Sequence, residues 1–291
     1  MQNLEQLLDD FFQCNRVSLI ENYPGINKKV LQDSLSDFLG TNLDLLLFPS
    51  FSELKKINTF FSKVNKGIPL AYITNLGHFY GRDFYINESV LIPRFETEEL
   101  TVLAIEYVNN IEKDLINVAE VGVGSGCIGL TLVAECFHKN INLIGHDISE
   151  DALDVARTNL DKLQFCLPKK SIVNFSLSDR LSESELGCHD LIVSNPPYIK
   201  TKQDMESVHQ QVKSFEPDLA LFIEDDKYDD WFNTFFSQVE SCLRSDGLFL
   251  MEGHENHLND LKKMASGFSF KEIKIIKDLS QRDRILSLKK I

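Results

Sequence analysis

A glycine-rich turn between a predicted strand and a predicted helix restricts the fold more than any other feature of this sequence. Residues 116–121 form a short apolar run, and residues 128–136 have the apolar spacing of a helix. The turn between them is EVGVGSGCIG, from Glu120 to Gly129. Glycine lets the backbone bend sharply and lets a ligand approach closely. The segment therefore predicts the strand–turn–helix unit that opens a doubly wound α/β sheet.

Six further strands are predicted after this unit, and most of them alternate with helices. They are residues 142–145, 172–177, 190–194, 248–251, 268–276 and 284–288. Such alternation predicts a mainly parallel, doubly wound sheet, here of seven strands. The last two strands are separated only by residues 278–283, which predicts that they pair antiparallel.

The chain before this sheet has a different character. Residues 1–75 contain three helical apolar stripes and are nearly neutral, whereas the remainder carries nearly all of the net charge of −14. Residues 78–92 are rich in aromatic and β-branched side chains around Gly81, which favours a hairpin. We therefore expect a helical domain over 1–75, a β-hairpin connector over 76–95 and the α/β domain over 96–291.

The charge and the cysteines argue against several classes of protein. With 30 basic and 44 acidic residues, the chain would repel phosphate, so no direct nucleic-acid partner is expected. The six cysteines include no C-x-x-C pair, which is typical of reduced thiols in the cytoplasm. We see no basic leader and no apolar run of about 18 residues, so neither export nor a membrane partner is expected. His254 and His257 lack a nearby third ligand, so no metal site is predicted.

The glycine spacing favours one cofactor. A dinucleotide-binding G-x-G-x-x-G would need glycine where Cys127 stands, whereas acid-x-G-x-G-x-G suits S-adenosyl-L-methionine, which has no pyrophosphate. Glu120 can face the positive end of the methionine moiety. The predicted cofactor-binding residues of this turn are Glu120, Gly122, Val123, Gly124, Ser125 and Gly126. A tight strand–helix turn without a ligand is the alternative.

Acidic residues also follow the next two predicted strands. Asp147 lies 25 residues after Gly122, where its carboxylate can accept hydrogen bonds from both ribose hydroxyls. Asp179 ends the third strand and can meet the adenine amino group. Each residue has a simpler interpretation: Asp147 as a turn residue before the helix cap Ser149, and Asp179 as a solvated loop carboxylate.

The fourth predicted strand is followed by NPPY, residues 195–198. Prolines fix φ and leave rigid carbonyl acceptors. Asn195 Oδ1 and the Pro196 carbonyl can each accept one N–H of a planar –NH2 group, and Tyr198 can stack on its conjugated plane. The nitrogen lone pair would then point at an electrophile. We predict Asn195, Pro196, Pro197 and Tyr198 as catalytic residues and assign Asn195 to the cofactor site as well; a polyproline turn is the alternative.

With these motifs the sequence resembles the HemK/PrmC family, and the resemblance covers nearly the whole chain. Beyond the glycine turn it rests on VLIPRFETE (90–98), SNPPYI (194–199), FEPDLAL (215–221) and Asp278 with RDR (282–284). NPPY alone is shared with DNA and RNA amino methyltransferases. Its combination with I-P-R-x-E-T-E is much more specific.

The resemblance implies a class I, Rossmann-like methyltransferase that uses S-adenosyl-L-methionine. Its substrate would be the side-chain amide nitrogen of the glutamine in the Gly-Gly-Gln motif of peptide-chain release factors. The resemblance also implies that residues 1–75 dock this protein. Two residues depart from the family pattern: Phe95 stands where proline is usual, and Arg180 replaces a frequent aromatic residue but can also stack on adenine.

Two alternatives to this function stay open. A nucleobase amino methyltransferase would hold the same planar –NH2 group, but it would need a basic groove. A catalytically idle binding module would use the sheet to hold a partner, although intact Glu120, Asp147 and NPPY argue against it. Methyl transfer to a release factor, a duplex DNA and an rRNA separates the enzymes, and calorimetry of cofactor binding separates the module from both.

Overall fold

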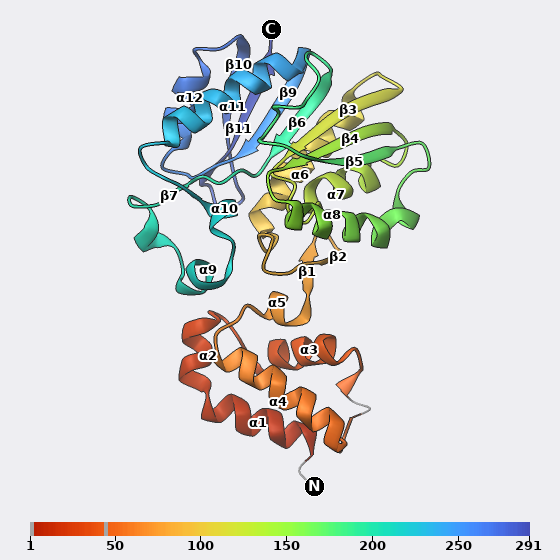
Figure 1. Ribbon diagram of the computed structural model, residues 1–291, viewed down its shortest axis with the longest axis vertical. Coiled ribbons are helices and arrows are strands. Elements are labelled where there is room, and N and C mark those ends of the chain that lie inside the picture. Colours follow the sequence, from red (N-terminus) through yellow and green to blue (C-terminus); the bar gives the residue numbers. More distant parts are fainter. Residues whose placement is uncertain (1–2, 44–45) are drawn as a thin grey trace. The chain divides into compact units, whose positions relative to one another are not determined.

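The computed structural model describes residues 3–43 and 46–291, and the chain divides into two compact units (Figure 1). The helical unit contains the described residues up to Gly77, with Ile86–Glu88 and Val208–Glu216. The sheet unit contains His78–Tyr85, Ser89–Ser207 and Pro217–Ile291. Segments of the two units therefore alternate along the sequence.

The helical unit consists of amphipathic helices that share one core. Its described helices are α1 (Leu4–Cys14), α2 (Arg16–Asn22), α3 (Lys28–Leu39), α4 (Phe51–Asn65), α5 (Leu70–Thr74) and α9 (Gln210–Phe215). Ser50 and Glu53 form a capping box at the start of α4, and Gly40, with φ of 65°, ends α3. Leu35 and Phe60 are completely buried between the helices. The predicted N-terminal helical domain is thus present.

The sheet unit is built on seven strands in the order β10-β11-β9-β6-β3-β4-β5. The strands are β3 (Leu115–Val121), β4 (Asn140–Asp147), β5 (Ile172–Leu177), β6 (His189–Ser194), β9 (Leu243–Glu252), β10 (Phe270–Lys277) and β11 (Asp283–Lys290). The strands from β9 to β5 pair parallel, and β11 is antiparallel to both of its neighbours. This confirms the predicted seven-stranded, mainly parallel sheet.

Helices cover both faces of this sheet (Figure 1). They are α6 (Phe95–Asn110), α7 (Cys127–Glu135), α8 (Glu150–Leu163), α11 (Tyr228–Cys242) and α12 (Leu258–Ala265), with the short α10 (Asp218–Leu221). Leu191 and Val193 of β6 belong to the core under α6 and α7, whereas Ile192 belongs to the core under α11 and α12. Because successive side chains of a strand point to opposite faces, a strand that is covered on both sides carries a continuous apolar run, which in β6 spans residues 191–193.

Two small strand pairs accompany the main sheet. β1 (Leu76–Phe79) and β2 (Arg82–Tyr85) form a hairpin whose turn residues, Tyr80 and Gly81, have positive φ of 51° and 69°. Positive φ at both turn positions matches the twist of paired strands. The second pair, β7 (Ile199–Lys200) with β8 (Phe222–Ile223), is absent from the sequence prediction because two residues carry no periodic pattern.

Phe95 departs from the family pattern but causes no local distortion. It is the first residue of α6, and Arg94 precedes it as the extended N-cap. The first helical position favours proline because its backbone N–H has no partner within the helix, yet any residue can stand there. The Phe95 side chain is exposed, so the substitution leaves the helix start intact.

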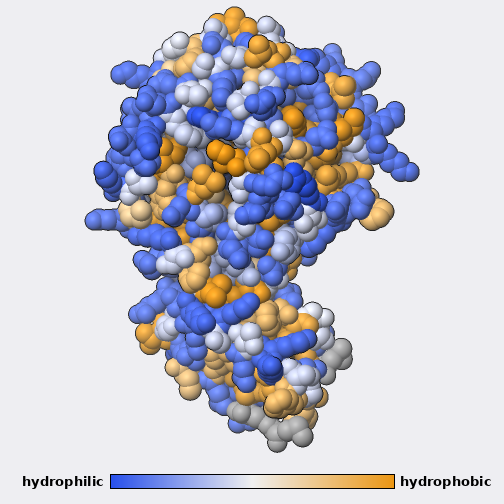
Figure 2. Space-filling model, in the orientation of Figure 1, coloured by the Kyte–Doolittle hydropathy of each residue, from blue (hydrophilic) through white to orange (hydrophobic). Residues whose placement is uncertain are grey.

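The exposed surface is mostly polar on the face drawn in Figure 2, and the cysteines form no disulfide. On the face drawn in Figure 2, hydrophobic residues occur in groups within a mostly hydrophilic surface. Among residues 3–43 and 46–291, no helix is both long and apolar enough to cross a bilayer. All six cysteines are free thiols, and Cys127, Cys136 and Cys242 are buried as small apolar side chains.

Candidate active site

The predicted site residues meet at the carboxyl ends of neighbouring parallel strands. The glycine turn follows β3, Asp147 ends β4, and NPPY follows β6. Val121 of β3 pairs in register with Ser194 of β6, and the Ser194 hydroxyl donates to the Val121 carbonyl at 2.8 Å. Ligands of doubly wound sheets bind at this edge, where strand order reverses. The sheet order places that reversal between β3 and β6.

The glycine turn passes close to the NPPY backbone. Gly122, Gly124 and Gly126 have φ of 71°, 50° and 76°, which residues with a side chain rarely adopt. The N–H groups of Gly122 and Val123 both donate to the His146 carbonyl, at 2.8 and 3.1 Å. A Cβ at Gly122 would lie 3.6 Å from the Asn195 carbonyl oxygen. The predicted cofactor turn and the predicted substrate motif are therefore neighbours.

The Glu120 side chain is a buried carboxyl group that could bind a cation. Its side chain is almost completely buried, and Oε2 accepts the Gly129 N–H at 3.0 Å. Among the residues that the structure describes, none is a hydrogen-bond partner of Oε1. Burial raises the pKa of Glu120 to about 8. A Cβ at Gly129 would lie 2.3 Å from Oε2, so only glycine leaves room for this carboxyl group. An orphaned, desolvated carboxyl oxygen fits the ammonium group of a methionine moiety.

Asp147 joins the turn to the end of β4. Its Oδ2 accepts the Gly124 N–H at 2.9 Å, and its Oδ1 accepts the Ser149 N–H at 3.0 Å. Burial raises the pKa of Asp147, and hydrogen bonds from the backbone N–H groups of Gly124, Ser149 and Ile148 act in the opposite direction. Each carboxylate oxygen can accept a second hydrogen bond. The arrangement is compatible with the predicted ribose contact while also holding the turn, as the simpler interpretation expects.

Asp179 and Arg180 form a pair. Arg180 Nε and Nη2 donate to the two Asp179 oxygens at 3.0 and 2.7 Å. The guanidinium lies 4.9 Å from the Trp231 ring, and its Nη1 donates to the Trp231 carbonyl. Arg180 has φ of 55°, which turns its side chain onto α11. The adenine contacts of both residues stay predictions.

A buried hydrogen-bond chain orients Asn195. Asn195 Nδ2 donates to Thr97 Oγ1 at 3.1 Å, and Thr97 Oγ1 donates to Glu252 Oε2 at 2.7 Å. The Tyr198 hydroxyl donates to Glu252 Oε1 at 2.9 Å. Because the Thr97 proton is given to Glu252, Thr97 must accept from Asn195, and this fixes which end of the amide is the nitrogen. Asn195 Oδ1 is therefore the end turned away from Thr97.

Glu252 and Thr97 are site residues that sequence reasoning missed. Glu252 ends β9 and is completely buried, so burial raises its pKa while Thr97 and Tyr198 lower it. Burial also raises the pKa of Tyr198. The signal for Glu252 was its place at the carboxyl end of a predicted strand, as for Asp147. Thr97 lies within the segment VLIPRFETE that carries the family resemblance.

The sheet order, the glycine turn after β3 and the acidic residue ending β4 define a class I S-adenosyl-L-methionine-dependent methyltransferase. Residues 102–217 match the methyltransferase small domain family. The fold is shared with the hMettl16 catalytic domain, solved in complex with the MAT2A 3′UTR hairpin 6. That match has a TM-score of 0.53 at 15% identity and covers 72% of this chain and 76% of that one.

Relatives of known name narrow the class to one family. The release factor glutamine methyltransferase of Bacillus cereus is 32% identical over 236 residues, 80% of each chain. That of Bacteroides thetaiotaomicron is 29% identical over 284 residues, 94% of this chain and 96% of the relative. That of Staphylococcus aureus is 34% identical over 77% of this chain and 76% of its own. The chain belongs to the family of release factor glutamine methyltransferases, and its methyl donor is S-adenosyl-L-methionine.

Proposed function

We propose that this chain methylates the side-chain amide nitrogen of the glutamine in the Gly-Gly-Gln motif of peptide-chain release factors. The observation that carries this proposal is the chain from Asn195 through Thr97 to Glu252. It holds an amide oxygen in a fixed direction at the sheet edge where the cofactor turn lies. A fixed acceptor beside an electrophile site is what a weakly nucleophilic –NH2 group requires.

The clamp residues act on the amide before and during transfer. Asn195 Oδ1 and the Pro196 carbonyl accept its two N–H groups, and Tyr198 packs on its plane. When bound, S-adenosyl-L-methionine supplies an activated methyl group. Asn195 Oδ1 and the Pro196 carbonyl oxygen would stabilise the positive charge that grows on the amide nitrogen as it accepts the methyl group. The methylated nitrogen then releases one proton to water, so no strong general base is needed.

The cofactor residues form a separate part of the proposal. Glu120 would meet the ammonium group of the methionine moiety, because its Oε1 is buried and without a partner. The backbone of residues 122–126 would cradle the cofactor, and Asp147 would accept the ribose hydroxyls. Asp179 and Arg180 would border the adenine. Positive φ at the three glycines supports the cradle, since a close backbone approach needs no side chain there.

The helical domain over residues 1–75 would dock the release factor. The net charge of −14 argues against a nucleic-acid substrate, and translation termination would place the reaction in the cytoplasm. The sheet domain over 96–291 would carry the chemistry, with the hairpin over 76–95 as connector. The compact units divide the chain differently, because Ile86–Glu88 of the connector and Val208–Glu216 of the sheet domain both belong to the helical unit, where Gln211 Nε2 donates to the Gly67 carbonyl at 2.8 Å.

A transfer assay with labelled cofactor tests the substrate. A release factor, the same factor with the motif glutamine replaced by asparagine, a duplex DNA and an rRNA are offered side by side. We expect label only in the factor with intact glutamine. Label in DNA or rRNA, or equal label in the asparagine variant, would contradict the proposal.

A further inference from the structure

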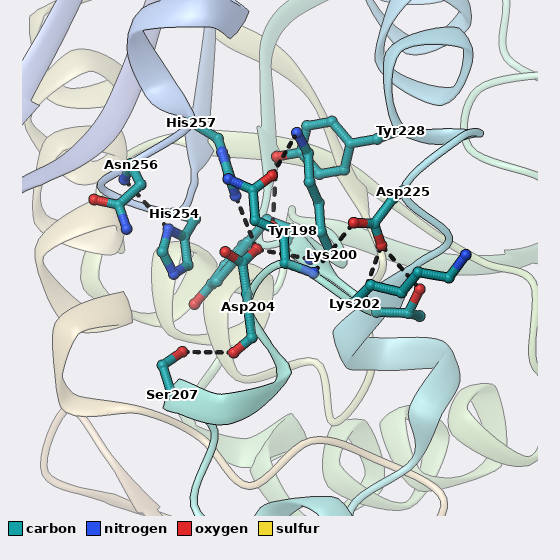
Figure 3. A network of polar contacts seen from close by, with 12 residues as sticks. Tyr198, Lys200, Lys202, Asp204, Ser207, Asp225, Tyr228, His254, Asn256 and His257 are labelled. Carbon is teal, nitrogen blue, oxygen red and sulfur yellow. Dashed lines mark hydrogen bonds and ion pairs between the residues drawn. The ribbon is translucent and has the colours of Figure 1, made fainter.

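A cluster of three metal-ligating side chains lies beside the substrate clamp, outside the residues assigned to methyl transfer. Asp204 follows β7, and His254 and His257 lie in the turn between β9 and α12 (Figure 3). One potential ligand atom from each residue lies within 4.8 Å of the other two. Asp204 and His257 are buried, and His254 is half-buried. The sequence alone could not show this cluster, because its third member is 50 residues from His254.

The contacts of Asp204 hold the cluster together. Its Oδ2 lies 2.8 Å from His257 Nε2 and also accepts the Lys200 N–H at 2.9 Å. The His254 ring lies against the His257 ring, with centroids 4.9 Å apart. A buried His–Asp pair can be a purely structural hydrogen bond. Here a second imidazole, that of His254 in the same turn as His257, lies close to the same carboxylate, and imidazole is a ligand that transition metals prefer.

We propose that Asp204, His254 and His257 bind one divalent transition-metal ion, with Zn²⁺ as the ion that this ligand set suits best. Two imidazoles and one carboxylate are three of the four ligands of a tetrahedral zinc site, and water takes the fourth position. Bonds of about 2.0–2.1 Å place ligand atoms about 3.4 Å apart. Binding of the ion through Asp204 Oδ2 and His257 Nε2 would therefore replace their hydrogen bond and widen their 2.8 Å separation slightly.

The ion would join two segments that flank the clamp. His254 follows Glu252 by two residues, and its ring centroid lies 6.4 Å from that of Tyr198. Asp204 accepts the N–H of Lys200, which follows Tyr198 by two residues. After Ser207 the chain continues into Val208–Glu216 of the helical unit. The ion thus would restrain the segment by which the chain leaves the clamp, and it would take no part in methyl transfer.

Metal titration of the full chain tests the site without any substrate. Protein freed of metal with EDTA is titrated with Zn²⁺ by calorimetry and with Co²⁺ by visible absorption. We expect one ion per chain, an absorption band from low-symmetry Co²⁺, and a rise of the apparent Tm. His254→Gln leaves the His257–Asp204 pair intact and should weaken binding by more than about 100-fold, since loss of an outer-shell partner alone costs about 10–100-fold. Asp204→Asn should do the same.

The matched control is His78→Gln. His78 Nδ1 lies 2.7 Å from Asp83 Oδ1, so it also belongs to a His–Asp pair, but this pair is exposed and belongs to no such three-residue group among the described residues. We expect unchanged metal affinity in this variant. The proposal is overturned if the wild-type chain binds neither ion. It is also overturned if His254→Gln and Asp204→Asn bind metal as tightly as the wild type does.

Discussion

The two halves of the active site are constructed differently. On the cofactor side the contacts are local: Glu120 meets Gly129 nine residues later, and Asp147 meets Gly124 at a separation of 23. In the substrate clamp Asn195 meets Thr97 at a separation of 98, and Thr97 meets Glu252 at 155. The first half depends mainly on backbone conformation, and the second on a chain of side chains from three distant elements.

This difference predicts that substitutions in the two halves affect different steps of the reaction. Damage to the cofactor side should weaken cofactor binding, because the proposed function places those groups against the bound donor both before and during transfer. Damage to the clamp should lower kcat, because the proposed function has its oxygens stabilise charge that appears only in the transition state. The predictions that follow test this division, from the largest effect to the smallest.

Asn195→Ala should cause the largest loss. Removing one of two fixed acceptors is expected to lower kcat about 10²–10³-fold, by analogy with loss of one oxyanion-hole donor. Single-turnover methyl transfer to a release factor measures it, with circular dichroism as the control for folding. Cofactor affinity should fall much less than kcat, although Asn195 is also assigned to the cofactor site. A variant that keeps more than about half of the wild-type kcat would remove Asn195 from the clamp.

Glu252→Gln should lower kcat about 10²-fold, because a misplaced clamp loses the aligned geometry. A glutamine has only one oxygen, so it cannot accept from both Thr97 and Tyr198. Thr97→Val should act in the same direction. The matched control is Thr101→Val in the same helix, since the buried Thr101 hydroxyl only donates to the Thr97 carbonyl. Equal losses in Thr97→Val and Thr101→Val would show a packing effect and not amide orientation.

The same division explains what could be predicted from sequence. The strands, the glycine turn, Asp147 and NPPY follow from apolar periodicity and from residues next to strand ends, which are local signals. Glu252 stands at a strand end too, yet its partners Thr97 and Tyr198 come from other elements, so only the fold assigns its role.

Other features depend on packing that no local pattern contains. Asp204 joins His257 only after β7 and the turn beyond β9 come together. The Arg180 guanidinium packs on Trp231, which lies 51 residues away. The sequence analysis noted only that Arg180 replaces a frequent aromatic residue, and this did not suggest the contact with Trp231. The observed strand ends also differ from the predicted ones. β4 extends over Asn140–Asp147, whereas 142–145 were predicted, because β3 and β5 both pair with it.

Asp147→Ala should weaken S-adenosyl-L-methionine binding by about 1.5–3 kcal/mol, the range for losing hydrogen bonds to a charged group. Calorimetry measures the dissociation constant. The matched control is Asp151→Ala in the first turn of α8, since Asp151 is exposed. If Asp147→Ala binds the cofactor as the wild type does, Asp147 belongs to the turn and not to the ribose site.

Glu120 should make cofactor binding depend on pH. Its pKa of about 8 in the folded chain exceeds its ordinary value of 4.5, so below pH 8 the cationic donor must displace a proton. Affinity should therefore rise as pH rises, by about tenfold at most between pH 6 and 7. The same raised pKa stabilises the ligand-free fold below pH 4.5, and this contribution is lost as pH rises through 8.

Glu120→Gln separates these effects. It should weaken binding and flatten its pH dependence, while the ligand-free chain should lose less stability between pH 5 and 8 than the wild type does. Calorimetry and thermal unfolding at several pH values measure both. An equally steep pH dependence in Glu120→Gln would assign the titration to another group.

Phe51→Ser should have the smallest effect and tests the helical domain as a docking element. Phe51 is the first residue of α4 and is 87% exposed, so its replacement should leave the fold intact. If residues 1–75 dock the release factor, losing this apolar contact should raise KM a few-fold, about 1 kcal/mol, with kcat and cofactor affinity unchanged.

The matched control is Phe165→Ser in the sheet unit, where Phe165 is 91% exposed. A lower kcat in Phe51→Ser, or the same rise of KM in both variants, would contradict a docking role confined to the helical domain. Either result would also contradict the proposed separation between substrate docking by the helical domain and catalysis by the sheet domain.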